Sequence, residues 1–247
     1  FDGHYEEWRL KRTRAIIEHY GAEWFRGKKL LELGCGHGDI GAAFWTLGAD
    51  VVFVEGRKEH VKLIRERFPM IASHKIIVAD MDRGLNLVRD FGRFDLIVHL
   101  GLLYHLDHWQ RSIAECGAIA PLMVLETEVA DSDDPTFELK VKEEGYDQAL
   151  RGTGTRPSAD FVERTLEDSG WHHERLRDSR CNAAIHRYDW TVARGSTAYG
   201  ASGGAQGAEQ RFARSDEPAR TPGPEPVEAH PALSPEPVEG RTVSPEP

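Results

Sequence analysis

The sequence has few cysteines and no long apolar run, and each shortage excludes a class of protein. Its three cysteines, Cys35, Cys116 and Cys181, are widely spaced and odd in number. They provide neither a disulfide framework nor a cysteine-rich zinc site, and they fit a reducing compartment. No apolar stretch approaches the roughly 20 residues of a membrane-spanning helix. We therefore expect a cytoplasmic protein with no membrane partner.

Basic residues are also scarce, because 31 Lys and Arg stand against 41 Asp and Glu, for a net charge of −10. Residues 195–247 carry four Arg and eight acids, a net charge of −4 that leaves −6 for the rest. A domain with that charge does not hold a polyanion such as a nucleic acid by bulk electrostatics. A local basic patch is still possible, because Lys11, Arg12, Arg14, Lys28 and Lys29 lie close together early in the chain.

Apolar periodicity is missing from residues 195–247, which hold nine of the 13 prolines and repeat the string PEPVE. Such a segment cannot bury enough apolar surface to offset its ordering entropy, so we predict a disordered tail. It is either a proline-rich docking segment or, as we favour, a neutral extension. Residues 1–194 then form a single domain. The chain opens on Phe1 and not on Met, so we expect a segment before it.

Within that domain, short β-rich runs alternate with helix-like segments after a first amphipathic helix at 4–20. This alternation predicts an α/β fold with a doubly wound, mostly parallel sheet covered by helices on both faces. The core is expected at 28–129. Strands are expected at 29–33, 51–54, 75–79, 94–99 and 122–127, and helices at 39–47, 57–68 and 107–119.

The chain after the fifth predicted strand is polar over 131–156, where we expect an irregular insertion or lid. Ser158 is placed to cap a helix that ends at Gly170. Two further strands, at 172–176 and 183–190, complete a seven-stranded sheet with a terminal antiparallel hairpin.

The string LLELGCGHGDIG at 30–41 places Glu32 in front of glycines 34, 36, 38 and 41. Its second half matches the G-x-G-x-x-G pattern of dinucleotide-binding folds, so a nicotinamide-binding protein is one alternative. However, Glu32 would face a phosphate of like charge. A carboxylate there suits a cationic or zwitterionic ligand without phosphate. A structural turn without any ligand is also open.

Read from Glu32, the pattern E-x-G-x-G-x-G resembles motif I of class I S-adenosylmethionine (SAM)-dependent methyltransferases. The resemblance extends over about residues 5–190. It implies a Rossmann-like methyltransferase fold, SAM as cofactor and methyl transfer as the reaction. SAM carries a sulfonium, an ammonium and a carboxylate but no phosphate, which agrees with the charge argument.

Two more acids follow predicted strands, where ligands of such sheets bind. Glu55 ends the second strand and has the geometry to accept both ribose hydroxyl protons. Asp80 follows the third strand, and the resemblance implies that it pairs with the adenine amino group. The predicted cofactor-binding residues are Glu32, Gly34, Cys35, Gly36, Glu55, Gly56, Arg57, Asp80, Met81 and Leu100.

The strings LGLLYHL at 100–106, VLETEV at 124–129 and TRPS at 155–158 resemble one branch of the family, the tRNA wobble-uridine carboxymethyltransferases. These enzymes use carboxy-S-adenosylmethionine (carboxy-SAM). The resemblance implies that Leu100 touches the cofactor and that Tyr104 hydrogen-bonds near the transferred group. The branch usually has Asp where Glu32 stands and carries basic residues in a longer N-terminal region. Methyl transfer to a small molecule is therefore our default, and transfer to tRNA from carboxy-SAM is the alternative. A non-catalytic Rossmann-like protein is also open.

A general base is needed only for an acceptor that is a poor nucleophile at neutral pH. We rank His105 first, because imidazole changes protonation near neutrality, then Tyr104, then Glu126. His99, His105 and His108 suggest a metal site, and His105 and His108 could share one face of a helix. A catalytic metal needs a third protein ligand in good geometry, and the spacing does not provide one, so we expect no metal. His60 is expected on a helix surface.

Overall fold

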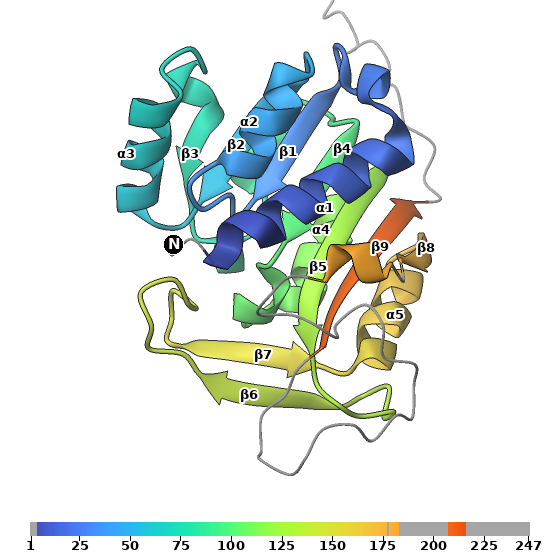
Figure 1. The fold of residues 1–247 in the computed structure, drawn as a ribbon. Coiled ribbons are helices and arrows are strands. Elements are labelled where there is room, and N and C mark those ends of the chain that lie inside the picture. Colours follow the sequence, from blue (N-terminus) through green and yellow to red (C-terminus); the bar gives the residue numbers. More distant parts are fainter. Residues whose placement is uncertain (1–3, 177, 183–206, 216–247) are drawn as a thin grey trace, which may run out of the picture.

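The protein is described by a computed structural model that covers residues 4–176, 178–182 and 207–215. Its centre is a seven-stranded sheet in the order β3-β2-β1-β4-β5-β9-β8 (Figure 1). The run from β3 to β5 is parallel, which confirms the predicted doubly wound α/β sheet. The strands are β1 Lys29–Leu33, β2 Asp50–Glu55, β3 Ile76–Val78, β4 Leu96–Leu100, β5 Leu122–Val129, β8 Trp171–Leu176 and β9 Gly207–Ser215.

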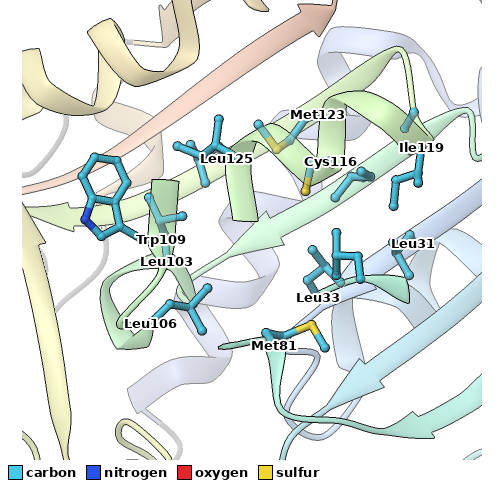
Figure 2. Close-up of a cluster of buried hydrophobic side chains, with 14 of the residues drawn as sticks. Leu31, Leu33, Met81, Leu103, Leu106, Trp109, Cys116, Ile119, Met123 and Leu125 are labelled. Atoms are coloured by element: carbon cyan, nitrogen blue, oxygen red, sulfur yellow. The ribbon is translucent and has the colours of Figure 1, made fainter. Parts of the chain in front are cut away.

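Helices cover both faces of this sheet, as predicted. Alternate side chains of a strand point to opposite faces. Leu30 of β1 belongs to a buried cluster with residues of α1, α2 and α3, whereas Leu31 and Leu33 join residues of α4 and α5. Figure 2 shows part of the second cluster, where Trp109 and Cys116 of α4 lie over Met123 and Leu125 of β5. The helices are α1 His4–Tyr20, α2 Asp39–Thr46, α3 Lys58–Arg67, α4 Trp109–Ile119 and α5 Ala159–Asp168.

Short 3₁₀ helices lie in several of the connections. They are η1 Ala22–Phe25, η2 Ser73–Lys75, η3 Met81–Arg83, η4 Asn86–Phe91, η5 Leu103–His105 and η6 Ser179–Cys181. The α5 cap is as predicted, since the Ser158 hydroxyl accepts a hydrogen bond from the amide of Phe161 at 3.1 Å. Within the described residues, no helix combines the length and apolar character that crossing a membrane requires.

The C-terminal segment needs a correction. Residues 207–215, which lie inside the predicted disordered tail, form strand β9 between β5 and β8. The strand pairs antiparallel on both sides, from Leu122↔Arg214 to Val129↔Gly207 and from Trp171↔Ser215 to Leu176↔Gln210. Backbone pairing to two partners is a non-local contribution that local composition does not reveal. The predicted strand at 183–190 lies outside the described residues.

The segment after β5 is also more regular than predicted. Instead of an irregular insertion, it contains the antiparallel pair β6 Glu138–Lys142 and β7 Thr153–Pro157. We call residues 138–157 the β6–β7 arm. In Figure 1 the arm lies across the end of the sheet toward which the arrows of β1 and β5 point. The fold therefore places an additional layer over the edge where the strand-end acids are located.

Candidate active site

Two adjoining hollows lie at the carboxyl ends of the parallel strands. Counting the part that is open to solvent, their empty volumes are about 640 and about 940 Å³. Among the predicted site residues, the first hollow is lined by Glu55, Gly56, Arg57, Asp80 and Met81. The second is lined by Glu32, Cys35, Leu100 and Tyr104. Gly34, Gly36 and His105 line both. The structure thus brings every predicted site residue to one place.

The glycine turn between β1 and α2 lines both hollows. Gly34 and Gly36 have φ angles of +65° and +53°, a conformation that glycine adopts without strain. Gly41 is required for a different reason, since a Cβ there would lie 2.3 Å from Oε2 of Glu32 and 2.4 Å from the Phe53 ring. Cys35 lies in the turn, and burial raises the pKa of its thiol well above the ordinary value. A thiol in that state is not a nucleophile at neutral pH.

Glu32 lies behind the turn, with only 4% of its surface exposed. Its Oε2 accepts a hydrogen bond from the amide of Gly41 at 3.0 Å. Burial raises the pKa of the carboxyl to about 8, although the bond from Gly41 acts in the opposite direction. The group therefore holds a proton at neutral pH in the free protein, and a cation in the second hollow would favour its charged form.

The raised pKa of Glu32 predicts a stability change with pH. The folded protein keeps this proton up to about pH 8, whereas the ordinary carboxyl value is 4.5. The contribution of Glu32 to stability is thus complete below about pH 4.5 and is lost as the pH rises through about 8. Glu32→Gln is neutral throughout. Between about pH 5 and pH 8.5, its free energy of unfolding should improve relative to the parent by on the order of a few kcal/mol. Urea titrations of the parent and the variant at both pH values measure this difference in the free energy of unfolding. The same difference at both pH values would disprove the prediction. Glu23→Gln, which changes an exposed side chain, is the control.

Glu55 is fastened by backbone amides at the end of β2. Its Oε2 accepts from Gly36 and its Oε1 from Arg57, both at 2.9 Å. Burial alone would raise the pKa of Glu55, but the bonds from His60, Arg57 and Gly36 outweigh it and lower the pKa. His60 is only 2% exposed, so the predicted surface position is wrong. Its ring nitrogens lie 3.5 Å from Glu55 and 3.5 Å from Asp147 of the arm, which the helical spacing alone did not indicate.

Asp80 contacts the arm directly. Its Oδ1 accepts from the amide of Asp82 at 3.0 Å and its Oδ2 from the guanidinium of Arg151 at 2.9 Å. The Arg57 guanidinium donates to the backbone oxygen of Gln148. The loop at 143–152 thus forms a roof over the first hollow. No pattern in the sequence predicted that the insertion would contact the strand-end acids.

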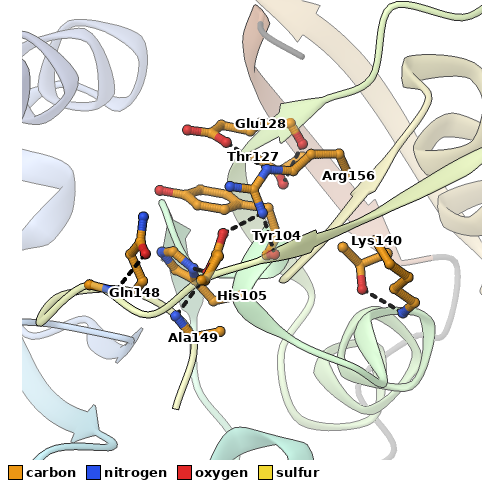
Figure 3. Close-up of polar contacts among 11 residues, drawn as sticks. Tyr104, His105, Thr127, Glu128, Lys140, Gln148, Ala149 and Arg156 are labelled. Atoms are coloured by element: carbon orange, nitrogen blue, oxygen red, sulfur yellow. Dashed lines mark hydrogen bonds and ion pairs between the residues drawn. The ribbon is translucent and has the colours of Figure 1, made fainter. Parts of the chain in front are cut away.

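His105 is paired with a buried acid of the same loop. Its Nδ1 lies 2.5 Å from Oε2 of Glu143, whose surface is 1% exposed. Glu143 also accepts from the amide of Ala149 at 2.8 Å and lies 2.5 Å from Nη1 of Arg156. Figure 3 labels His105, Ala149 and Arg156, the three residues that meet here. Burial alone would raise the pKa of Glu143, but His105, Ala149 and Arg156 outweigh it and lower the pKa to about 2. The sequence reasoning missed Glu143. The TRPS string contains Arg156 but did not indicate its partner.

Arg156 also organises the other side of the second hollow. Its guanidinium lies 4.6 Å from the centre of the Tyr104 ring, and Nη1 donates to the Tyr104 backbone oxygen at 3.1 Å. Its Nε donates to Glu128 at 2.7 Å. A single cation from β7 thus holds η5, β5 and the arm in one arrangement.

Glu126 is the weakest of the candidate bases, because its oxygens are already occupied. Arg12 donates from Nε at 3.1 and 3.0 Å and from Nη2 at 3.0 Å, and the Trp8 indole donates at 3.1 Å. Arg12 is fully buried and Glu126 is 2% exposed. The pair ties α1 to β5, and Glu126 lines the second hollow.

The histidines considered for a metal site are separated in the fold. His99 is fully buried in β4, with Nε2 3.2 Å from the hydroxyl of Ser112. His108 is exposed, and only its backbone amide binds Asp82, at 2.9 Å. Across the part of the chain that the structure describes, no three His, Cys, Asp or Glu side chains gather in a way that could hold a metal ion.

Residues 5–176 match the family model described as a methyltransferase domain. The chain belongs to this family. The prediction of a SAM-dependent methyltransferase enzyme is therefore confirmed at the level of the family. No curated protein matches the chain.

Solved structures agree in fold. The N-terminal domain of EvdMO1, in the presence of S-adenosylhomocysteine (SAH) and D-fucose, is 19% identical with a TM-score of 0.62, over 84% of this chain and 82% of that domain. A SAM-dependent methyltransferase from Mesorhizobium loti is 18% identical with a TM-score of 0.53, over 78% of this chain and 98% of that one. The 1,6-didemethyltoxoflavin-N1-methyltransferase of Burkholderia thailandensis is 16% identical with a TM-score of 0.52, over 86% of this chain and 79% of that one. At these identities the likeness supports the Rossmann-like methyltransferase fold.

Proposed function

We propose that the protein transfers a methyl group from SAM to a small-molecule acceptor. The observation that carries this proposal is the continuity of the two hollows at Gly34, Gly36 and His105. Adenosine fits the first hollow, with its ribose at Glu55 and its amino group at Asp80. The methionine part fits the second, along the glycine turn. The sulfonium methyl then lies at the junction, beside His105.

The walls of the second hollow support a small acceptor. Trp8 of α1, Tyr104 of η5 and Glu128 of β5 line it beside the junction, and Asp147 of the arm lines both hollows. Similar proteins point the same way: the EvdMO1 domain was solved in the presence of D-fucose, and the Burkholderia enzyme with 1,6-didemethyltoxoflavin bound.

Calorimetric titration of the full chain with SAH tests the cofactor assignment. We expect saturable binding of SAH and none of NADH. Mass spectrometry of small molecules released from the purified protein then identifies the bound donor. Absence of SAH binding, or binding of NADH in its place, would remove the proposal.

Glu55→Ala should weaken SAH binding at least about tenfold, because it removes one or two charge-assisted hydrogen bonds of about 1.5–3 kcal/mol each. Calorimetry of the variant and the parent measures the difference. Glu59→Ala, on an exposed position of α3, is the matched control and should bind as the parent does. Since Glu55 also fastens Gly36, circular dichroism must show that the variant is folded. Equal affinity in a folded variant argues against the ribose role.

Carboxy-SAM is the second donor to consider, on the resemblance of residues 100–106 and 124–129. Glu126 and Glu128 line the second hollow and are already paired with Arg12 and Arg156. Arg9 there lies 3.3 Å from Asp39, so these cations are engaged by protein acids and not by an additional carboxylate. The released donor distinguishes the two by mass, and we expect unmodified SAM. We also expect no retention of tRNA in a gel-shift assay at physiological salt, because the chain is acidic.

A further inference from the structure

The contact between η5 and the arm goes beyond binding a cofactor. Resting on the proposed function, we propose that Glu143 is a positioning residue that holds His105 as a general base, with Nε2 toward the junction, for an acceptor that reacts through a hydroxyl group. The starting observation is the distance of 2.5 Å between Nδ1 of His105 and Oε2 of Glu143.

The chemistry of the pair decides which nitrogen carries the proton. A charged carboxylate only accepts hydrogen bonds, so Nδ1 must be the donor. In the neutral imidazole the lone pair is then on Nε2. Among the described residues, Nε2 of His105 makes no hydrogen bond, and the side chain lines both hollows. The basic nitrogen is therefore left for a ligand at the junction.

Glu143 is held in the form that this role requires. Its Oε2 accepts from the amide of Ala149 at 2.8 Å as well as facing His105. Its Oε1 lies 2.5 Å from Nη1 of Arg156, an ion pair without the angle of a hydrogen bond. A carboxylate that is 1% exposed and surrounded by three positive or donor groups stays charged and fixed. Removal of the imidazole would leave it without its third partner.

The two acids of β5 in the second hollow are less available than His105. Glu126 is bound by Arg12 and Trp8. Glu128 is bound by Arg156, whose guanidinium also covers the Tyr104 ring. Of these three groups, His105 combines a fixed orientation with an open basic atom at the junction.

The step balances without an additional reactant. The acceptor oxygen attacks the sulfonium methyl, so that a C–O bond forms, the S–C bond breaks, and its electron pair stays on sulfur to give SAH. The hydroxyl proton passes to Nε2. The imidazolium keeps its Nδ1 proton toward Glu143, and water then removes the proton from Nε2. A neutral amine attacks with its own lone pair before losing a proton, so it gains less from such a base. The hydroxyl class is the one that the pair serves.

Long-range ¹H–¹⁵N correlation spectra of the full chain test the arrangement, because they report the imidazole tautomer. The peaks of His105 are assigned by their loss in His105→Gln. We expect the neutral form of the parent to carry its proton on Nδ1, both free and with SAH. Glu143→Ala should convert it mainly to the Nε2–H form that free imidazole side chains prefer. Glu144→Ala is the matched control, since Glu144 is exposed and pairs with Lys142 at 2.7 Å, and it should leave the tautomer unchanged.

Two results would overturn the inference: an Nε2–H tautomer in the parent, or an unchanged Nδ1–H tautomer in Glu143→Ala. If that variant does not fold, the parent spectrum still shows which nitrogen of His105 carries the proton. Glu143→Gln, which removes the charge and keeps the size, then replaces Glu143→Ala in the comparison. Failure of SAH to bind would instead remove the proposed function, and the spectrum of the free protein would still test the pair. The two failures are therefore separable.

Discussion

His105→Ala is expected to slow methyl transfer to a hydroxyl acceptor by about 10²–10⁴-fold, the usual contribution of a positioned general base. The physical reason is its position, since the ring lines both hollows and its Nδ1 is held 2.5 Å from Glu143. Formation of SAH from SAM with an accepted hydroxyl compound measures the rate. The affinity for SAH should change by no more than a few-fold, because the charged groups at the first hollow are untouched.

The control for this experiment is His108→Ala. The His108 side chain is exposed, and the hydrogen bond to Asp82 comes from the His108 backbone amide. The rate of His108→Ala should therefore equal that of the parent. A His105→Ala variant with the rate of the parent would show that the base lies elsewhere.

Arg12→Ala should lower the free energy of unfolding by about 3–5 kcal/mol, because it leaves the Glu126 carboxylate buried without its counter-charge. Both side chains are almost fully enclosed, and the Arg12 Nη1 also donates to the backbone oxygen of Cys181 at 2.5 Å. The loss should be visible as a lower urea midpoint. It should also weaken SAH binding, since Trp8 and Glu126 line the second hollow.

Arg14→Ala provides the matched comparison two residues along the same helix. Arg14 is exposed and pairs with Glu18 at 2.7 Å, so its removal should cost no more than about 1 kcal/mol. The double variant Arg12→Met with Glu126→Leu removes both charges and should recover much of the stability. If Arg12→Ala and Arg14→Ala had equal costs, the buried pair would not stabilise α1 on the sheet.

The parallel core was predictable because its signals are local. Each of the five parallel strands is an apolar β-rich run that ends near a Gly, an acid or a turn, and each helix between them has a cap or breaker in sequence. The helix boundaries agree to within two residues. The strand-end rule then located Glu55 and Asp80 at the same edge without any knowledge of the contacts.

Strand β9 and the arm were not predictable for the opposite reason, since both depend on contacts between distant parts of the chain. Strand β9 has no β-rich run, and it is defined by pairing to β5 and β8. The arm is polar, and its contacts join residues far apart in the chain, such as Arg151 with Asp80. His60 was misplaced because a helix position gives the face but not what later packs against it.

The sequence by itself determined where the parallel strands, the glycine turn and the acids that follow the strands lie along the chain, since each depends on residues close together in the chain. Only the tertiary structure decided which of those groups remain open to a ligand. In the folded protein Arg12 pairs with Glu126, the arm covers the first hollow, and Glu143 lies against His105. The reason is physical: the state of a buried charge depends on the partners that folding brings to it, and these come from elsewhere in the chain.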